Sequence, residues 1–215
     1  MTLYFKKPIL AWSLYDFANS AFATSILSVI FNVYFVKIIC ADTVIIAGRR
    51  IPGESFWGYT VSLSMLIVFI LGPVLGAAAD KYPLKKKLLF FFAMTGSIFT
   101  ALLYFCGPGD WRSAALYFMI ANVGFAAGNI FYNALLNEIS TPENVGRISG
   151  FGWAVGYLGG GLLLALNLAI ITRPDLFHIP TENHMPVRIC ILSVAIWWSI
   201  FSTPLFLWVK EDKAS

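Results

Sequence analysis

Charged residues are scarce in this sequence. Of 215 residues, 12% are Asp, Glu, Lys or Arg and 59% are hydrophobic, whereas soluble domains carry about 25% charged residues. The deficit argues against an ordinary soluble protein. Six stretches reach the ~20 predominantly apolar residues that are needed to cross a hydrocarbon core about 30 Å thick. The composition therefore predicts an integral, multi-pass membrane protein with no room for a separate soluble domain.

Cysteine and histidine are also rare, with three cysteines and two histidines. Cys40, Cys106 and Cys190 stand far apart, so they form no spacing typical of a zinc or redox site. We therefore predict neither a metal site nor a cofactor, and no nucleic-acid partner. The cysteines are expected to act as apolar side chains at span ends. A disulfide between two of them is an alternative, because all three fall on the same predicted side of the membrane.

The six apolar stretches predict six transmembrane helices. They cover residues 9–36, 57–79, 87–106, 113–137, 148–171 and 187–209. The connectors are not rich in Ser or Gly, so we predict a single all-α domain over residues 1–215. Six such helices suggest a bundle, and helices one to three and four to six can be related by a 3+3 inverted repeat, as in many transporters.

Lysine and arginine are distributed unevenly between the two sides of the predicted bundle. Nine lie at the two termini and in the second and fourth connectors, and six lie on the opposite side. The sharper signal is the cluster Lys81, Lys85, Lys86 and Lys87, which sits beside two span ends. Because cytoplasmic loops concentrate Lys and Arg, we expect this side, and hence both termini, to be cytoplasmic.

Asp16 is the only ionisable side chain well inside a predicted span. It lies roughly 12 Å deep at 1.5 Å per residue, and Asn19 and Ser20 share its helix face. A second polar stripe, formed by Ser25, Ser28 and Asn32, is predicted about half a turn away. Two interpretations of Asp16 are open. It is a structural carboxyl, bonded to a neighbouring helix or reached by water, or it is a substrate or proton site.

Asparagines line one face of the fourth predicted helix. Asn122, Asn129, Asn133 and Asn137 fall within about 80° of one another around its axis. Lipid offers amides no hydrogen-bond partner, so these side chains must face protein or water. Interhelical hydrogen bonding is one explanation, and a lining for the path of a polar solute is the other.

The fifth predicted helix is dense in glycine. Gly152, Gly156 and Gly160 repeat every four residues and form a groove into which another helix can pack closely. We predict tight helix packing there, with sliding of helices during a conformational cycle as the alternative. Trp153 and Tyr157 stand beside the groove, where they either line a cavity or simply pack.

The loop after the second predicted helix carries a recognisable motif. Residues 76–87 read GAAADKYPLKKK, which resembles the signature loop of the major facilitator superfamily, although Pro83 stands where that family usually has Gly. Gly76 permits close helix approach, and Asp80 can accept hydrogen bonds from a helix start and pair with a cation. The resemblance implies a cytoplasmic gate formed by Gly76, Asp80, Lys81, Lys85 and Arg147.

Three further stretches narrow the resemblance. Residues 11–22 read AWSLYDFANSAF, residues 131–139 read FYNALLNEI and residues 146–160 read GRISGFGWAVGYLGG. Together they resemble the branch related to the yeast vacuolar effluxer linked to autophagy. Members usually have twelve spans in two six-helix halves, and this chain resembles the N-terminal half. The resemblance implies secondary transport of a small polar solute, amino acids among them, in a bacterial inner (plasma) membrane.

Three hypotheses follow. In the first, the chain is a transporter half that pairs with a separate half or a second copy, with Asp16, Asn19, Asn129 and Asn133 lining the cavity. In the second, it is a truncated remnant without transport of its own. In the third, it is a membrane enzyme using Ser149. His178 and His184 both fall in the last external connector, so no base lies within reach of Ser149, and we predict that the chain is not an enzyme.

Overall fold

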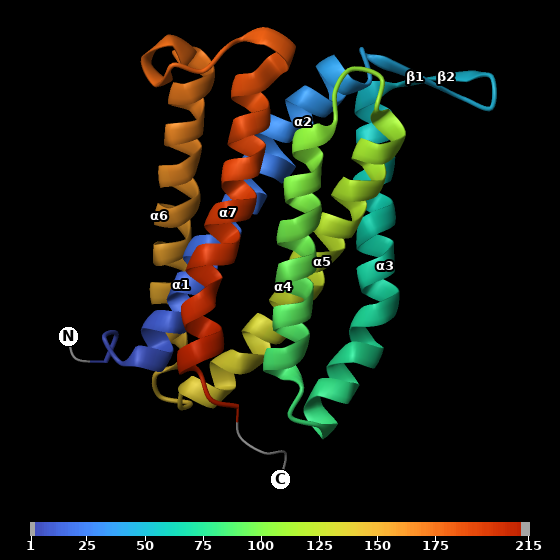
Figure 1. Ribbon diagram of the computed structural model, residues 1–215. Coiled ribbons are helices and arrows are strands. Elements are labelled where there is room, and N and C mark those ends of the chain that lie inside the picture. The colour runs from blue at the N-terminus through green and yellow to red at the C-terminus, as the bar shows by residue number, and fades with distance from the viewer. Residues whose placement is uncertain (1–2, 212–215) are drawn as a thin grey trace.

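The computed structural model describes residues 3–211, apart from the side chains of residues 78 and 80. Within this part of the chain, six helices are long and apolar enough to cross a membrane. They stand side by side in one bundle, with the first and last described residues at the same end (Figure 1). The prediction of an all-α, six-helix half bundle is confirmed.

The helices match the predicted spans to within a few residues. The first span comprises α1 (Lys7–Ala21), η1 (Phe22–Val29), α2 (Ile30–Tyr34) and η2 (Phe35–Ile39). The others are α3 (Gly53–Lys81), α4 (Lys85–Leu102) with the short η3 (Leu103–Phe105), α5 (Trp111–Ile139), α6 (Val145–Thr172) and α7 (Met185–Trp208). Two short turns, η4 (Pro174–Phe177) and η5 (Glu182–His184), connect α6 to α7.

The first span is not a uniform α-helix, as its prediction assumed. The segments η1 and η2 are π-helical, and this winding puts more residues into each turn than the 3.6 of an α-helix. Residues that repeat every four positions then stay on one side of the span. The polar set Asp16, Ser20, Thr24, Ser28 and Asn32 has this spacing, and all five are partly or fully exposed. Ser28 and Asn32, predicted in a second stripe, therefore extend the stripe of Asp16, whereas Ser25 of that predicted stripe is buried.

A β-hairpin that the sequence analysis missed follows the first span. Strands β1 (Thr43–Ile46) and β2 (Arg49–Pro52) pair antiparallel, and the hairpin projects from the bundle end opposite the termini (Figure 1). Ala47 and Gly48 form its two-residue turn with φ of 49° and 78°. Two-residue hairpin turns need such positive φ values. The β-branched run before Ala47-Gly48 was the available sequence signal.

The core is largely aromatic, and it lies between α1, α4, α5 and α7. Trp12, Tyr15, Phe118 and Trp198 are at most 1% exposed. In contrast, α3 exposes many large apolar side chains, namely Tyr59, Leu63, Leu66, Phe69, Ile70 and Val74. A chain that is dissolved in lipid or covered by further helices can leave such a surface on the outside.

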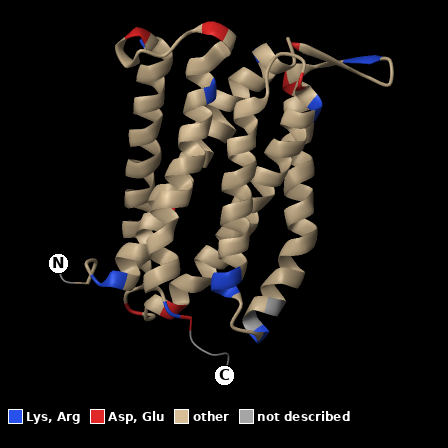
Figure 2. Cartoon of the chain, in the orientation of Figure 1, with Lys and Arg blue, Asp and Glu red and all other residues tan. Residues whose placement is uncertain are grey.

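The charged side chains gather at the two ends of the bundle and leave the helix middles almost free of charge (Figure 2). This distribution matches a bilayer, because a charge at its centre is costly. Lys85, Lys86 and Lys87 begin α4, whose start lies at the same end of the bundle as the N- and C-terminal segments (Figure 1).

The three cysteines are free and buried, so the disulfide left open by the sequence is not formed in the described structure. Burial raises the pKa of the Cys40 and Cys106 thiols to about 11. The thiolate is the reactive form, so we expect both to react slowly with maleimides at neutral pH and faster as the pH rises toward about 11. Mass spectrometry after timed labelling of the folded protein tests this. Rapid modification of Cys40 or Cys106 at neutral pH would contradict it.

Candidate functional site

A cavity of about 210 Å³ lies between the first span and α6. It is lined by Asp16, Ser20, Ala23, Thr24, Trp153 and Tyr157. The structure therefore brings Asp16 together with the two aromatic residues that the sequence singled out. The Trp153 and Tyr157 ring centroids lie 6.0 Å apart, and these side chains are 61% and 70% exposed. The cavity thus opens to the outside of the bundle.

Glycines on α6 make room for the carboxyl-bearing face of α1. A Cβ atom at Gly156 would lie 2.6 Å from Asp16 Oδ2 and 2.9 Å from Ser20 Oγ, which is closer than real Cβ contacts come. Gly152 similarly accommodates the ring of Trp12. Asp16 therefore sits against bare helix backbone.

Further along the same contact, the two helices are joined by a hydrogen bond. A Cβ at Gly160 would lie 3.0 Å from the Ser20 carbonyl oxygen, and Thr24 Oγ1 lies 3.3 Å from the Gly160 carbonyl oxygen, which accepts its hydrogen bond. Gly159, which the sequence analysis did not single out, makes the closest approach of all. A Cβ there would overlap the Phe17 carbonyl oxygen and ring.

An amide pair links α1 to α5. Asn19 Nδ2 donates to Asn129 Oδ1 over 2.7 Å, and Asn19 is 2% exposed. Trp12 Nε1 also donates to the Tyr132 carbonyl oxygen over 3.0 Å. Two of the predicted path residues, Asn19 and Asn129, therefore bond to each other. Asn19 follows Asp16 by three positions along the chain.

The four asparagines of α5 have different environments. Asn122 is fully buried and donates through Nδ2 to Ser64 Oγ of α3 over 2.8 Å. Its position does not support the prediction that it lines the same path, because it is a bonded core side chain away from the cavity. Asn133 and Asn137, by contrast, are exposed. Interhelical bonding thus accounts for Asn122 and Asn129.

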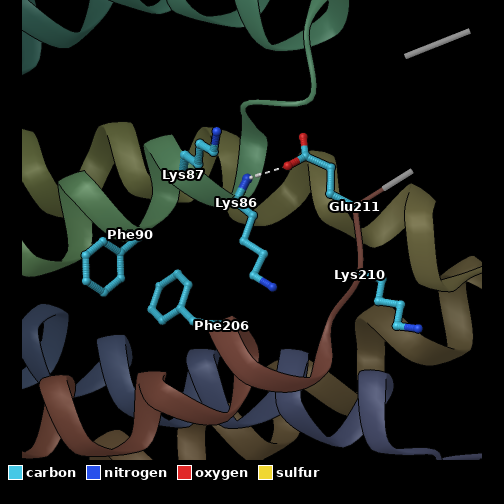
Figure 3. A pocket seen from close by; sticks show the side chains of 6 residues that line it. All are labelled: Lys86, Lys87, Phe90, Phe206, Lys210 and Glu211. Carbon is cyan, nitrogen blue, oxygen red and sulfur yellow. Dashed lines mark hydrogen bonds between the residues drawn. The ribbon is translucent and has the colours of Figure 1, made fainter. Parts of the chain in front are cut away.

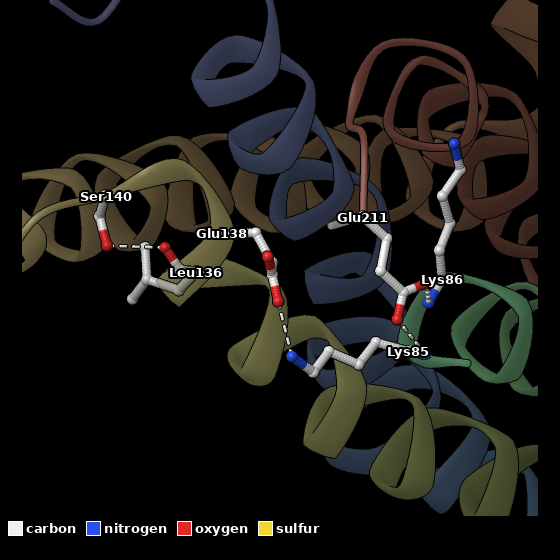
Figure 4. A network of polar contacts seen from close by, with 6 residues as sticks. All are labelled: Lys85, Lys86, Leu136, Glu138, Ser140 and Glu211. Carbon is white, nitrogen blue, oxygen red and sulfur yellow. Dashed lines mark hydrogen bonds and ion pairs between the residues drawn. The ribbon is translucent and has the colours of Figure 1, made fainter. Parts of the chain in front are cut away.

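A polar network ties three segments together at the lysine-rich end (Figure 4). Lys85 Nζ lies 2.6 Å from Glu138 Oε1 at the end of α5, and these side chains are only 19% and 15% exposed. Glu211, beyond α7, accepts hydrogen bonds from the backbone N–H groups of Lys85 and Lys86 over 2.7 and 3.2 Å. A carboxylate at a helix N-terminus is stabilising, so Glu211 caps α4.

The predicted gate residues whose side chains the structure describes make separate contacts. Lys81 is exposed and lies over the Tyr82 ring, whereas Arg147 lies over the Tyr4 ring, 5.9 Å from its centroid. A Cβ at Gly76 would meet nothing within 4 Å, so the close helix approach expected at Gly76 is absent from the described structure, where the end of α3 stands at the edge of the bundle.

Asp80, the fifth gate residue, belongs to the last turn of α3, but its side chain lies outside the described part of the structure. The sequence analysis missed three contributors that the structure reveals, namely Thr24, Glu138 and Glu211. Thr24 follows Asp16 at twice the four-residue spacing, which was a usable signal. The two glutamates pair with residues more than fifty positions away, and no local pattern indicates such pairs.

The buried ion pair leads to a stability prediction. Glu138→Gln removes the carboxylate that faces Lys85 and leaves that ammonium in a largely desolvated place, so we expect a loss of about 3 kcal/mol in the free energy of unfolding. Thermal unfolding of the detergent-solubilised protein measures it, with exposed Glu182→Gln as the matched control. Combining Glu138→Gln with Lys85→Gln is expected to recover part of the loss. An unchanged midpoint in Glu138→Gln contradicts a stabilising pair.

Comparison with known proteins agrees with this architecture. Residues 5–145 and 138–215 match the family described as "Vacuole effluxer Atg22 like". The chain is 29% identical over 207 residues to the uncharacterized MFS-type transporter YxiO of Bacillus subtilis, covering 96% of this chain and 47% of the relative. It is 25% identical over 220 residues to autophagy-related protein 22 of Yarrowia lipolytica, covering 76% of this chain and 36% of that protein.

An uncharacterized protein of Aquifex aeolicus is 28% identical over 173 residues, covering 79% of this chain and 40% of that protein. The chain thus spans less than half the length of these curated relatives. Two of the three relatives carry names of transport or autophagy proteins, and none is named as an enzyme. Because the family match extends over nearly all of the sequence, the chain belongs to the vacuole effluxer Atg22-like family.

Proposed function

We propose that this chain forms one six-helix half of a secondary transporter for a small polar solute. The observation that carries the proposal is the Asp16 cavity. A carboxyl inside an apolar bundle is costly and usually serves a partner, water or a transported solute. Here the cavity also holds hydroxyl groups and opens outward between α1 and α6. The names of the family and of its transporter relative support the same activity.

The chemistry of the cavity favours a solute with a cationic group. The Asp16 carboxylate would pair with an ammonium, and the hydroxyl groups of Ser20, Thr24 and Tyr157 would hydrogen-bond to its polar atoms. Trp153 offers an aromatic face of the kind that attracts cations. Asn133, exposed on α5, extends the polar surface. Amino acids, which carry an ammonium, are therefore the first solute class to test.

A second six-helix half would complete the path. The cavity opens at the surface of the bundle, and large apolar side chains are exposed both on α6 and, on the opposite side of the bundle, on α3 (Figure 1). The longer relatives have the length to supply a second half. The proposed occupant is a second half, whether separate or a second copy of this chain. The alternative is a remnant that has no transport of its own.

The lysine-rich end is proposed to face the cytoplasm of a bacterial plasma membrane, because Lys and Arg concentrate on that side. Both termini would then be cytoplasmic. Lys81 and Arg147, with Gly76 and Asp80, would act there as a gate. The Lys85–Glu138 pair would hold the start of α4 against the end of α5.

Solute counterflow in proteoliposomes tests the proposal. The chain is reconstituted alone and together with any co-expressed second half, and exchange of a radiolabelled amino-acid mixture is followed against protein-free liposomes. Exchange above the protein-free rate in either preparation supports a transporter half. Its absence in both, together with wild-type behaviour of Asp16→Asn in cells, supports the remnant instead.

A further inference from the structure

A second, larger groove lies between α4 and α7 at the lysine-rich end (Figure 3). It has a volume of about 620 Å³ and is lined by Lys86, Lys87, Phe90, Phe206, Lys210 and Glu211. None of these residues lines the Asp16 cavity. Figure 1 shows α4 and α7 in front of α5 and α1, so this groove belongs to a different pair of helices from the proposed solute path.

The charge of the groove is positive. Its lining contains three lysines and one carboxylate, that of Glu211. This carboxylate already accepts hydrogen bonds from two backbone N–H groups at the start of α4. Lys86 reaches between Phe206 and Lys210 (Figure 3), where its Nζ donates to the Val209 carbonyl oxygen over 2.8 Å. An ammonium has three donors, so Lys86 keeps two more. Lys87 and Lys210 are exposed.

The inner part of the groove is apolar and aromatic. The rings of Phe90 and Phe206 meet edge to face, with centroids 5.1 Å apart, and Phe90 is 51% exposed. Further along α7, Ile200 and Ile196 are exposed at 59% and 51%. Cations at the end of the bundle are thus followed by an aromatic surface formed by Phe90 and Phe206.

Lysines at the end of the bundle, followed by apolar side chains, fit an amphiphile with an anionic head. Basic pockets between transmembrane helices near the membrane surface bind anionic lipid headgroups, and ammonium groups form short, charge-assisted bonds to phosphate oxygens. We propose that the groove binds one anionic phospholipid, with its phosphate at Lys87 and Lys210 and one acyl chain along Phe90 and Phe206. The site is separate from the transport proposal and stands without it.

Native mass spectrometry of the purified chain in detergent tests the site. Phosphatidylglycerol and phosphatidylcholine are titrated onto wild type, Lys87→Gln, Lys87→Gln/Lys210→Gln and the control Lys81→Gln. Lys81 is an exposed lysine at the same end, on α3. Each lysine near an anionic surface is worth on the order of fivefold in affinity. We expect wild type and Lys81→Gln to prefer phosphatidylglycerol, the single variant to bind it about fivefold more weakly, and the double variant about twentyfold or more.

Several outcomes would overturn the proposal. Equal affinity of wild type for the two lipids removes the charge argument. Unchanged phosphatidylglycerol binding in the double variant, or an equal loss in Lys81→Gln, places the lipid elsewhere. Release of the lipid by millimolar inorganic phosphate indicates a free-phosphate site and not a lipid site. Circular dichroism checks the fold, and if the double variant does not fold, the single variant Lys87→Gln decides.

Discussion

Asp16→Asn is expected to impair solute exchange severely while leaving the six-helix fold intact. The substitution keeps the size of the side chain and its capacity to hydrogen-bond, but it removes the charge that would pair with a cationic solute. Asp16 lies against Gly156 on one side and the cavity on the other, so an isosteric amide fits the same space. We expect exchange to fall by at least about tenfold, the equivalent of about 1.4 kcal/mol.

Counterflow is the appropriate measurement, because it needs no proton gradient and therefore reports solute binding and translocation, not coupling alone. Asp175→Asn is the matched control. It makes the same chemical change at an exposed carboxylate beside Arg173, outside the membrane-spanning helices. Wild-type exchange in Asp16→Asn would assign the carboxyl a structural role. Loss of exchange together with loss of monodispersity would show that the Asp16 carboxyl is needed for folding.

Gly159→Ala is expected to destabilise the bundle more than other single methyl additions on α6. The added methyl group would overlap the carbonyl oxygen of Phe17, and backbone cannot move aside as a flexible side chain can. The two helices must separate, which opens the contacts of Gly156 and Gly160 as well. Overpacking of this kind costs about 1–3 kcal/mol, and we expect a value at the upper end.

Gly161→Ala provides the control, because a Cβ at Gly161 meets nothing within 4 Å. It lies in the same helix two residues further along, and the better helix propensity of Ala should leave it neutral or up to about 1 kcal/mol more stable. Chemical unfolding in mild detergent, followed by far-ultraviolet circular dichroism, measures both. Equal stability of the two variants would show that α1 does not pack on α6 as closely as described.

The helices were predictable because each carries enough apolar residues to cross a bilayer, and that signal is local. The π-helical winding of η1 was not predictable, because it depends on the backbone bonding of residues 22–29 and not on their polarity. Its effect is large, since it moves Ser28 and Asn32 from a separate stripe onto the side of Asp16. The hairpin at residues 43–52 carried a local signal in the β-branched run before Ala47-Gly48, which the sequence analysis treated as part of a connector.

The candidate site was predictable in part. Asp16, Trp153 and Tyr157 meet at one cavity because α1 and α6 pack through glycines, which the four-residue spacing of Gly152, Gly156 and Gly160 indicated. The asparagine face of α5 predicted the residues of the site less well, because Asn122 bonds to Ser64 in the core.

Helical periodicity tells which side chains share a face, but not which neighbouring helix each one meets. Asn122 meets α3 and Asn129 meets α1, so one face serves two contacts. The pairing of Lys85 with Glu138 and the capping of α4 by Glu211 depend on tertiary structure alone.

Water access to the cavity tests the central claim most directly. The helix α6 begins at Val145 and α7 ends at Trp208, at the same end of the bundle (Figure 1), so Trp153 and Ile200 each lie eight residues from it. Their exposed fractions are 61% and 59%. Each is replaced by cysteine in a background without the native cysteines, and open membrane fragments are treated with a charged, membrane-impermeant maleimide.

A solute path beside Asp16 predicts rapid labelling of Trp153→Cys and little labelling of Ile200→Cys, which faces lipid at the same depth. Equal, slow labelling of the two cysteines would mean that the Asp16 cavity is closed to water, and it would contradict the proposed path.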